Sequence, residues 1–283
     1  MHLLRISMPG YMNNLLTGQF YGKTNETVHM EGITLTDTEY THEKVDWHVH
    51  ENAYFTFIIN GKLLEGNKKE VFDCTSGSLL FHNSQEAHYN LKPEGYTRGF
   101  HIELDPKWFN SYDIRPESVS GSLNLVSPKM KMLMYNIFKE SKLSHKSGQP
   151  SIDALLLELF STISALKESH DKKRPYWVHM IRDILNDTTE DYSLSELAKM
   201  LNIHPVHLSR NFTRYFGCNL GEYIRTIKIQ KVISHLSETD CSLTHLALEC
   251  NFADQSHFIR SFKAQHLITP SQFRKLLQKD QKC

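Results

Sequence analysis

A pattern that occurs twice near the C-terminus constrains the fold of this chain more than any other feature. The first copy runs from Leu194 to Gly217 and the second from Leu243 to Leu267. Matching residues pair at an offset of 49 up to Asn202 and Asn251, and at an offset of 50 after them. A repeat whose one insertion falls between its halves predicts a supersecondary unit that is used twice, with a turn at the insertion.

Each copy has the pattern of two helices joined by a turn. The small Ala198 and Ala247 allow the second helix to cross the first closely, and asparagine at the turn tolerates a positive φ. One face of each second helix is apolar, while the other carries Ser and Arg in the first copy and Gln, Ser and Arg in the second. Because Arg and Gln make bidentate contacts to guanine and adenine, the pattern predicts two helix-turn-helix units that bind double-stranded DNA.

Roughly the last hundred residues resemble the DNA-binding domain of the AraC/XylS family of bacterial transcription regulators. The resemblance rests on residues of both copies and of the segment between them, among them Leu197, Ala198, Leu208, Phe212, Tyr223, Ile227, Ala247, Phe258, Phe262 and Pro270. The sequence departs from the family at Asn202 and Asn251, where turn glycines are usual, and at Lys228, where arginine is common. It also has Leu267 in place of a glycine. The resemblance therefore does not fix the residue at which the second helix of the second copy ends; the second helix of each copy is called its recognition helix.

The resemblance implies which side chains contact DNA and which partners the chain has. In the first recognition helix the candidate DNA-binding residues are Val206, Ser209, Arg210 and Arg214. In the second they are Gln255, Ser256, Ile259 and Arg260. Arg210 and Arg260 are the strongest candidates for base or phosphate contact, and an intramolecular salt bridge is the alternative for Arg210. The resemblance further implies a homodimer that acts together with RNA polymerase.

Length and charge fit two domains with different tasks. A chain of 283 residues is long enough for two domains that each bury a core. The formal net charge is zero, yet residues 171–283 carry sixteen Lys and Arg against twelve Asp and Glu. A mildly basic C-terminal part favours nucleic acid as its partner, although ordinary charge scatter would also account for so small a difference.

The cysteines and the apolar segments predict a cytoplasmic protein. Five cysteines, an odd number without a CxxC pair, favour a reducing compartment over a disulfide framework. We expect no membrane partner, because the longest apolar runs fall short of a membrane span. The N-terminus lacks the apolar segment of a signal peptide.

The region from Trp47 to Leu104 has a β pattern. Aromatic and β-branched runs such as Tyr54 to Gly61 end at turn residues, and further short strands follow at close spacing. Such spacing predicts a sandwich or a small barrel. This part resembles the cupin-like sensor domain that is common in the same regulator family.

The cupin resemblance places histidines where metal-binding cupins hold their ion. His48, His50 and His88 match three of the four ligand positions, and the fourth, usually Glu, falls at Tyr54. We therefore expect a ligand pocket that includes His48, His50, Tyr54 and His88. Two interpretations stay open. Either the three histidines bind a divalent metal, or they hydrogen-bond a small-molecule effector and no cofactor is required.

Two residues remain as alternatives for a fourth metal ligand. These are Glu51 and His101, whose positions relative to the three histidines the sequence does not give.

Residues 128–170 have helical periodicity in two segments, the second with Ser151 as its expected N-cap. This helical pair either packs on the barrel or dimerises. The expected fold class is α+β in two domains. Residues 1–127 form a cupin-like β-barrel, residues 128–170 the helical pair, and residues 171–283 an all-α domain with two helix-turn-helix units.

These features predict a sequence-specific transcription regulator with a small-molecule-sensing N-terminal domain. We expect no enzyme activity, since the sequence shows no nucleophile–base pair and no phosphate-binding loop. Two alternatives stay open. One is a metal-dependent cupin enzyme fused to a DNA-binding module, and the other is a ligand-independent regulator whose barrel only dimerises.

Overall fold

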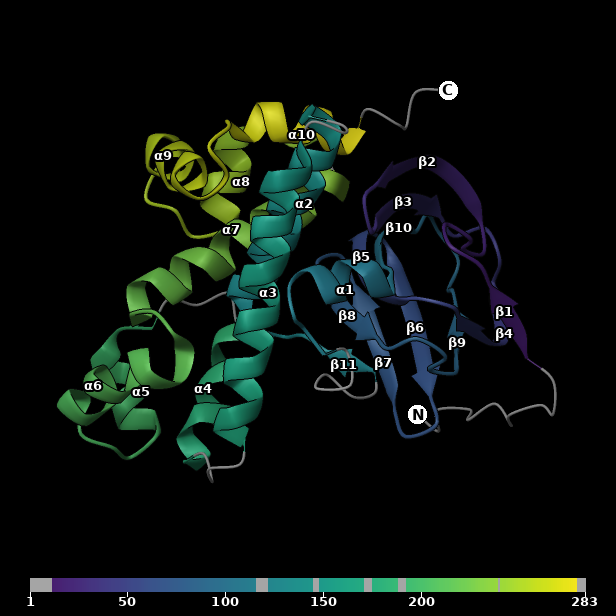
Figure 1. Cartoon of the computed structure of the whole chain (residues 1–283). Coiled ribbons are helices and arrows are strands. Elements are labelled where there is room, and N and C mark those ends of the chain that lie inside the picture. The colour runs from purple at the N-terminus through teal and green to yellow at the C-terminus, as the bar shows by residue number, and fades with distance from the viewer. Residues whose placement is uncertain are drawn as a thin grey trace. The chain divides into compact units, whose positions relative to one another are not determined.

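The structure is a computed structural model that describes residues 12–115, 122–144, 148–170, 175–187, 192–238 and 240–278 (Figure 1). The chain divides into two compact units, each described by itself. The first comprises Met1–Ser164 with Leu276–Cys283, and the second comprises Ala165–Lys275. The expected domain boundary at residue 171 falls within residues 171–174, which lie outside the described residues.

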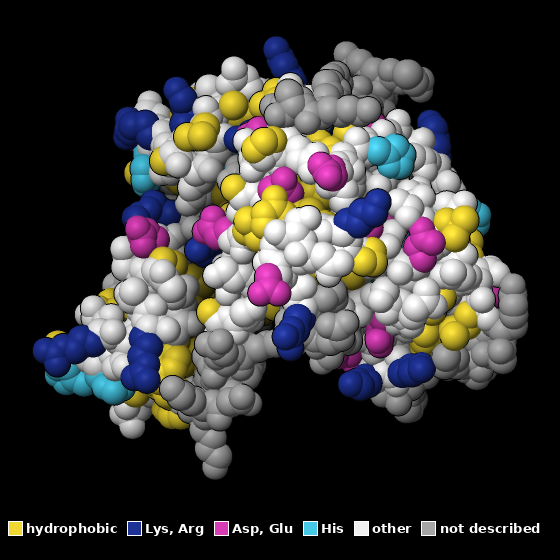
Figure 2. Space-filling view, viewed as in Figure 1, with side chains coloured by type: hydrophobic (Ala, Val, Ile, Leu, Met, Phe, Trp, Pro, Cys, Tyr) yellow, Lys and Arg dark blue, Asp and Glu magenta, His cyan; other side chains and the backbone are white. Residues whose placement is uncertain are grey.

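The second unit contains both copies of the repeat. It begins with α4 (Tyr176–Asp187), followed by α5 (Leu194–Met200) and α6 (Pro205–Phe216) of the first copy. The helix α7 (Leu220–Glu238) leads to α8 (Leu243–Glu249) and α9 (Gln255–His266) of the second copy. The helix α10 (Pro270–Gln278) follows, and its residues from Leu276 on belong to the first unit. Figure 2 shows Lys, Arg and His side chains gathered over α5 and α6 at the lower left. Both predicted helix-turn-helix units are therefore present.

The first unit contains two β-sheets whose inner faces line a common pocket. The five-stranded sheet has the order β1 (Asn13–Leu15), β4 (Lys44–His50), β9 (His88–Leu91), β6 (Lys62–Asn67) and β7 (Val71–Thr75). The six-stranded sheet has the order β11 (Leu123–Asn124), β8 (Leu79–His82), β5 (Ala53–Asn60), β10 (Arg98–Leu104), β3 (Ile33–Glu39) and β2 (Lys23–Met30). The α+β fold class with an N-terminal barrel is confirmed.

The outer face of the six-stranded sheet is apolar and is covered by helices. The ring of Phe57 lies 4.7 Å from Tyr135 of α2 (Pro128–Ser144), measured between ring centroids. Phe100 contacts the same helix, and Phe55 lies 5.5 Å from Phe160 of α3 (Gln149–His170). The helices α2 and α3 therefore pack on the barrel, which is one of the two arrangements expected for residues 128–170.

The expected N-cap of the second helix of this pair is wrong. The helix α3 begins at Gln149, so that Ser151 lies inside its first turn. The physical reason is Pro150, which a first helical turn accepts because the N–H that proline lacks has no partner there.

The inner face of the same sheet is polar. Thr36, Thr56 and His101 lie side by side on neighbouring strands, since the register pairs His101 with both threonines. The next inner row pairs Glu103 with Tyr54, and Tyr54 with His82. These side chains are buried. The sheet thus separates an apolar core beneath the helices from a polar interior between the sheets.

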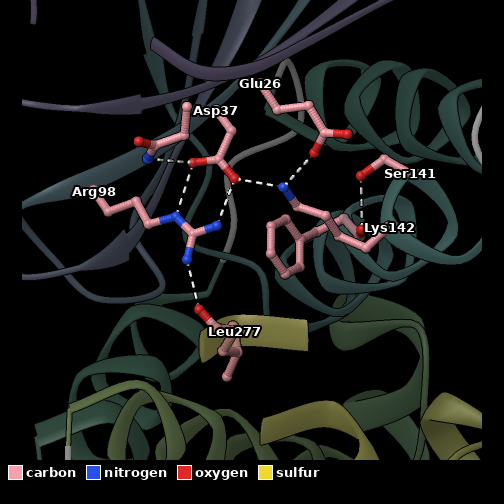
Figure 3. Close-up of polar contacts among 8 residues, drawn as sticks. Glu26, Asp37, Arg98, Ser141, Lys142 and Leu277 are labelled. Carbon is pink, nitrogen blue, oxygen red and sulfur yellow. Dashed lines mark hydrogen bonds and ion pairs between the residues drawn. The ribbon is translucent and has the colours of Figure 1, made fainter. Parts of the chain in front are cut away.

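A buried group of charges ties the sheet to α2 (Figure 3). The carboxylate of Asp37 accepts hydrogen bonds from Nε and Nη2 of Arg98, and from Nζ of Lys142 at 2.8 Å. Lys142 also donates to Glu26 at 2.7 Å, and Arg98 donates to the carbonyl of Leu277 in the C-terminal segment of the same unit. Burial would raise the pKa of Asp37, but Arg98 and Lys142 together lower it to about 2.

Replacing Asp37 tests the contribution of this charge group. Asp37→Asn removes the carboxylate that both buried cations contact, and we expect it to lower the free energy of unfolding by about 3–5 kcal/mol. The pKa of Asp37 lies below its unfolded value of 3.8. Its stabilisation, about 2 kcal/mol, is therefore present above pH 4 and is lost as the pH falls toward 2.

Urea unfolding of the wild type and the variant between pH 2 and pH 7 measures both effects. The matched control is Asp73→Asn on the exposed side of β7, which should change stability by less than about 0.5 kcal/mol. An unchanged acid dependence in Asp37→Asn would contradict the assignment.

Among the described residues, none of the helices is both long enough and apolar enough to cross a membrane.

Candidate nucleic-acid interface and barrel pocket

The first helix of each repeat begins at a serine cap. Oγ of Ser193 accepts from the backbone N–H of Glu196, whose carboxylate accepts from the N–H of Ser193 in return. In the second copy Ser242 accepts from the N–H of His245. The bonds to both serines satisfy N–H groups that have no partner within the helix, and the pair Ser193 and Glu196 is reciprocal. The two caps are 49 residues apart, as the repeat requires.

The turn in each copy has the backbone conformation that its asparagine predicts. Asn202 has a φ of 53° and Asn251 a φ of 57°. The next residue in each copy donates its N–H to the small alanine of the first helix, at 3.0 Å for Ala198 and 2.8 Å for Ala247. The connection spans residues 201–204 in the first copy and 250–254 in the second. The inserted residue therefore lies in the turn, as predicted.

The recognition helices α6 and α9 differ at both ends. His204 caps α6 through the N–H of Val206, whereas Asp254 caps α9 through the N–H of His257. At the C-terminal end Gly217 follows α6 with a φ of 76°. Leu267 follows α9 in the same left-handed conformation, with a φ of 62°. The second recognition helix thus ends at His266. The sequence did not determine this end, because Leu267 replaces the glycine that is usual in the family.

Apolar side chains fix which face of each recognition helix points outward. Leu208 and Phe212 of α6 are fully buried, as are Phe258 and Phe262 of α9. Phe212 also contacts Tyr223 of α7, with 5.7 Å between ring centroids. Lys228, also on α7, donates to the turn carbonyl of Asn251 at 2.6 Å. The linking helix therefore takes part in both copies.

The predicted DNA-binding residues lie on the outward faces. The exposed members are Val206, Ser209, Arg210 and Arg214 on α6, and Gln255, Ser256 and Arg260 on α9. Ile259 is only half-exposed, and the side-chain oxygen of Gln255 accepts a hydrogen bond from Thr244 at 2.6 Å. Within the described part of the chain Arg210 makes no salt bridge, so the alternative role for it has no support there. DNA contact by these residues stays a prediction.

Comparison with known proteins identifies this part of the chain. Residues 197–276 match a family model described as a helix-turn-helix domain. The C-terminal part is an AraC-type helix-turn-helix domain. An uncharacterized HTH-type transcriptional regulator of Staphylococcus aureus (strain COL) is 23% identical over 241 residues, covering 77% of this chain and 31% of that protein. The chain thus spans about a third of the length of the curated relatives it matches.

The chain is also similar to a further regulator and to solved structures. The HTH-type transcriptional regulator MtrA of Neisseria gonorrhoeae is 26% identical over 97 residues, which are 34% of this chain and 32% of that protein. Among solved structures, ToxT of Vibrio cholerae strain SCE256 with a bound unsaturated fatty acid covers 91% of this chain and 98% of its own, at 14% identity and a TM-score of 0.34. The C-terminal domain of the response regulator yesN from Fusobacterium nucleatum is 28% identical, covering 34% of this chain and 95% of its own at a TM-score of 0.33.

Leu267 in the AraC-type domain supports a stability prediction. A left-handed conformation costs a non-glycine residue about 1–2 kcal/mol, and Leu267 is 79% exposed, so that it gains little from burial. We expect Leu267→Gly to raise the free energy of unfolding by about 1 kcal/mol.

The control for this substitution is Leu248→Gly, because Leu248 is also exposed but lies within α8. It should lower stability by about 1 kcal/mol, since glycine is a poor helix former. Thermal unfolding of both variants distinguishes the effects. A loss of stability in Leu267→Gly would contradict the strain at this position.

The three predicted histidines come together inside the barrel. His48 and His50 alternate on β4 and point the same way, and His88 of β9 pairs with His48. Their candidate ligand atoms lie within 4.8 Å of one another, and all three residues are buried. Nδ1 of His48 lies 2.9 Å from the carbonyl of Asp46, and the ring of His88 makes the same bond to Glu86 at 3.0 Å.

Tyr54 belongs to the same group, as expected. Its hydroxyl lies 2.9 Å from Nε2 of His88, and its ring lies 4.4 Å from that of His50 between centroids. Nδ1 of His50 is buried and has no hydrogen-bond partner among the residues that the structure describes. Burial lowers the pKa of His50 to about 2 and pushes the pKa of His88 well below its usual value. Their rings are therefore neutral at pH 7, with one nitrogen lone pair each.

Neither alternative fourth ligand joins the three histidines. Glu51 accepts a hydrogen bond from the backbone N–H of Thr17 at 2.7 Å. His101 lines the same pocket, but its Nδ1 lies 3.2 Å from Oγ1 of Thr56 and its ring stacks on Phe20, with 3.8 Å between centroids.

The structure adds pocket residues that sequence reasoning missed. Glu65 of β6 is buried, lies 2.8 Å from Nε2 of His82, and accepts from the amide of Asn90 at 3.2 Å. Burial would raise the pKa of Glu65, but His82 lowers it to about 2. Burial also raises the pKa of Glu103 to about 7. The sequence signal for Glu65 was a charged residue directly after the apolar Leu63 and Leu64.

Proposed function

We propose that the chain is a sequence-specific DNA-binding transcription regulator whose N-terminal barrel senses a small ligand. The observation that carries the proposal is the repeated unit. Two helix-turn-helix copies share serine caps on their first helices, turn conformation and buried faces, and both present exposed Ser and Arg side chains, joined in the second copy by Gln255. Arg210 and Arg260 then contact bases or phosphates, while Arg214 contacts phosphate.

The proposal gives the barrel a sensing role and no reaction of its own. A ligand in the polar interior would act by binding one arrangement of the chain more tightly than another. A homodimer, contact with RNA polymerase and a cytoplasmic location belong to this proposal and rest on the resemblance to the AraC/XylS family.

Selection of bound sequences from a randomised duplex pool tests this function. The full chain should enrich a motif with two blocks about one helical turn apart. Arg210→Ala/Arg260→Ala should lose the enrichment, because each bidentate base contact contributes about 1–3 kcal/mol of discrimination.

The matched control is Lys62→Ala/Lys68→Ala, which removes the same charge from exposed positions of the first unit. It should enrich the same motif as the wild type. Equal enrichment by the arginine double variant would show that these two side chains do not read DNA.

The role of Arg214 is tested by the salt dependence of binding. Phosphate contacts release counterions, so a plot of log affinity against log salt is steep and negative. Arg214→Ala should make the slope shallower by about 1 and weaken all sequences equally. Fluorescence anisotropy on one selected and one scrambled duplex measures this, with Lys68→Ala as the control. A change in sequence preference would instead place Arg214 against a base.

A further inference from the structure

The side-chain amide of Gln255 is held in one orientation by the other helix of its repeat. Oγ1 of Thr244, on α8, donates to Oε1 of Gln255, the first residue of α9, at 2.6 Å. The two residues stand 11 positions apart across the turn, and both are exposed. The hydrogen bond thus fixes a side chain that the proposed function assigns to DNA.

The turn between α8 and α9 holds the two helices together without this bond. The N–H of Phe252 donates to the carbonyl of Ala247 at 2.8 Å. The buried ring of Phe252 also packs on Phe258 of α9, with 5.3 Å between ring centroids. We therefore expect that replacing Thr244 frees the amide of Gln255 and leaves the helix-turn-helix unit folded.

Thr244 has no helical carbonyl that competes for its hydroxyl. Inside a helix, a threonine hydroxyl often donates to the carbonyl three or four residues before it. Thr244 is the second residue of α8, so the residues at those distances, Asp240 and Cys241, come before the helix. The hydroxyl is thus left for Gln255.

This bond decides which polar group Gln255 presents to its surroundings. A side-chain amide has one oxygen, which accepts, and one nitrogen with two N–H donors. Because Thr244 holds the oxygen towards α8, the nitrogen of the same planar group points away from α8. Within the described part of the chain, that nitrogen has no hydrogen-bond partner. Gln255 therefore presents its donors, while its oxygen is engaged within the protein.

Donors on the protein match acceptors on a base. In the major groove guanine presents two acceptors, O6 and N7, whereas adenine combines the N7 acceptor with an N6 donor. A glutamine that turns freely makes a bidentate contact to adenine with its oxygen and nitrogen together. We propose that Thr244 is a positioning residue that shifts the base preference of Gln255 from adenine to guanine. The inference rests on the proposed DNA-binding function and adds the preference at one base pair.

The first copy of the repeat lacks this arrangement. Ser195 stands at the repeat position of Thr244, and Pro205 stands where the second copy has Gln255. Proline has no side-chain amide, so the hydroxyl of Ser195 has no such group to orient. The effect is therefore confined to the block of the DNA motif that the second copy contacts, and Ser195 provides a matched control.

Selection from a randomised duplex pool, with each variant in the full chain, tests the role of Thr244. Gln255→Leu locates the position, because it should lose the preference at one base pair and keep the rest of the motif. The wild type should prefer guanine there. Thr244→Val keeps the shape without the hydroxyl and should raise adenine relative to guanine about fivefold, as the loss of one hydrogen bond allows. Thr244→Ser keeps the hydroxyl and should keep guanine.

Two further variants sharpen this test. Ser195→Ala removes the hydroxyl at the same repeat position of the first copy and should leave the whole motif unchanged. Gln255→Glu replaces the donors with acceptors and should move the preference at the located base pair to cytosine, whose N4 is a donor.

Side-chain ¹⁵N relaxation measures the orientation of the amide without DNA. The Nε2 group of Gln255 should be ordered on the picosecond-to-nanosecond timescale in the wild type and in Thr244→Ser. In Thr244→Val it should be mobile on that timescale.

The outcomes separate this inference from the DNA-binding function. A two-block motif with the same preference at the located base pair in the wild type and in Thr244→Val would overturn the role of Thr244 and leave DNA binding intact. Adenine preference in the wild type, or equal mobility of the Gln255 amide in both proteins, would also overturn it. A wild type that enriches no motif would contradict the proposed function itself, and this inference with it.

Discussion

Burial of apolar side chains on one face of each element decides which face remains for function. In the six-stranded sheet, Phe55, Phe57 and Phe100 pack against α2 and α3. Because side chains alternate along a strand, this packing directs Tyr54, Thr56 and His101 to the inside. The polar pocket is thus a consequence of the apolar core on the other side of the sheet.

The same constraint shapes the helical repeat. On α6, Leu208 and Phe212 are buried, and Arg210 is exposed on the opposite face. On α9, Phe258 and Phe262 are buried, and Arg260 is exposed. The capped first helices and the asparagine turns hold the two helices of each copy together. Residues 197–276, which match the helix-turn-helix family model, therefore present two polar helix faces, each with an outward arginine.

Local patterns in the sequence predicted the features that depend on neighbouring residues. The repeat located both helix-turn-helix units and placed the inserted residue in the turn, where Asn202 and Asn251 adopt positive φ. Alternation along one strand placed His48 and His50 on the same face, and the cupin resemblance added His88. The end of α9 was not predicted, because a leucine at a left-handed position contradicts its local preference.

Features that depend on pairing between distant strands were not predicted. Glu65 and His82 meet only because β6 and β8 belong to different sheets that face one pocket. The contact of Asp37 with Arg98 and Lys142 joins residues up to 105 positions apart. Strand register and sheet order decide such contacts, and a single sequence gives neither.

The proposed function assigns the two polar helix faces to two contacts along one duplex. Hydroxyl-radical cleavage of a selected duplex bound to the full chain measures this most directly. Two protected blocks about one helical turn apart on one face of the DNA, each lost separately in Arg210→Ala or Arg260→Ala, are the expected result. A single protected block, or protection that both variants leave unchanged, would contradict the use of both helix-turn-helix units.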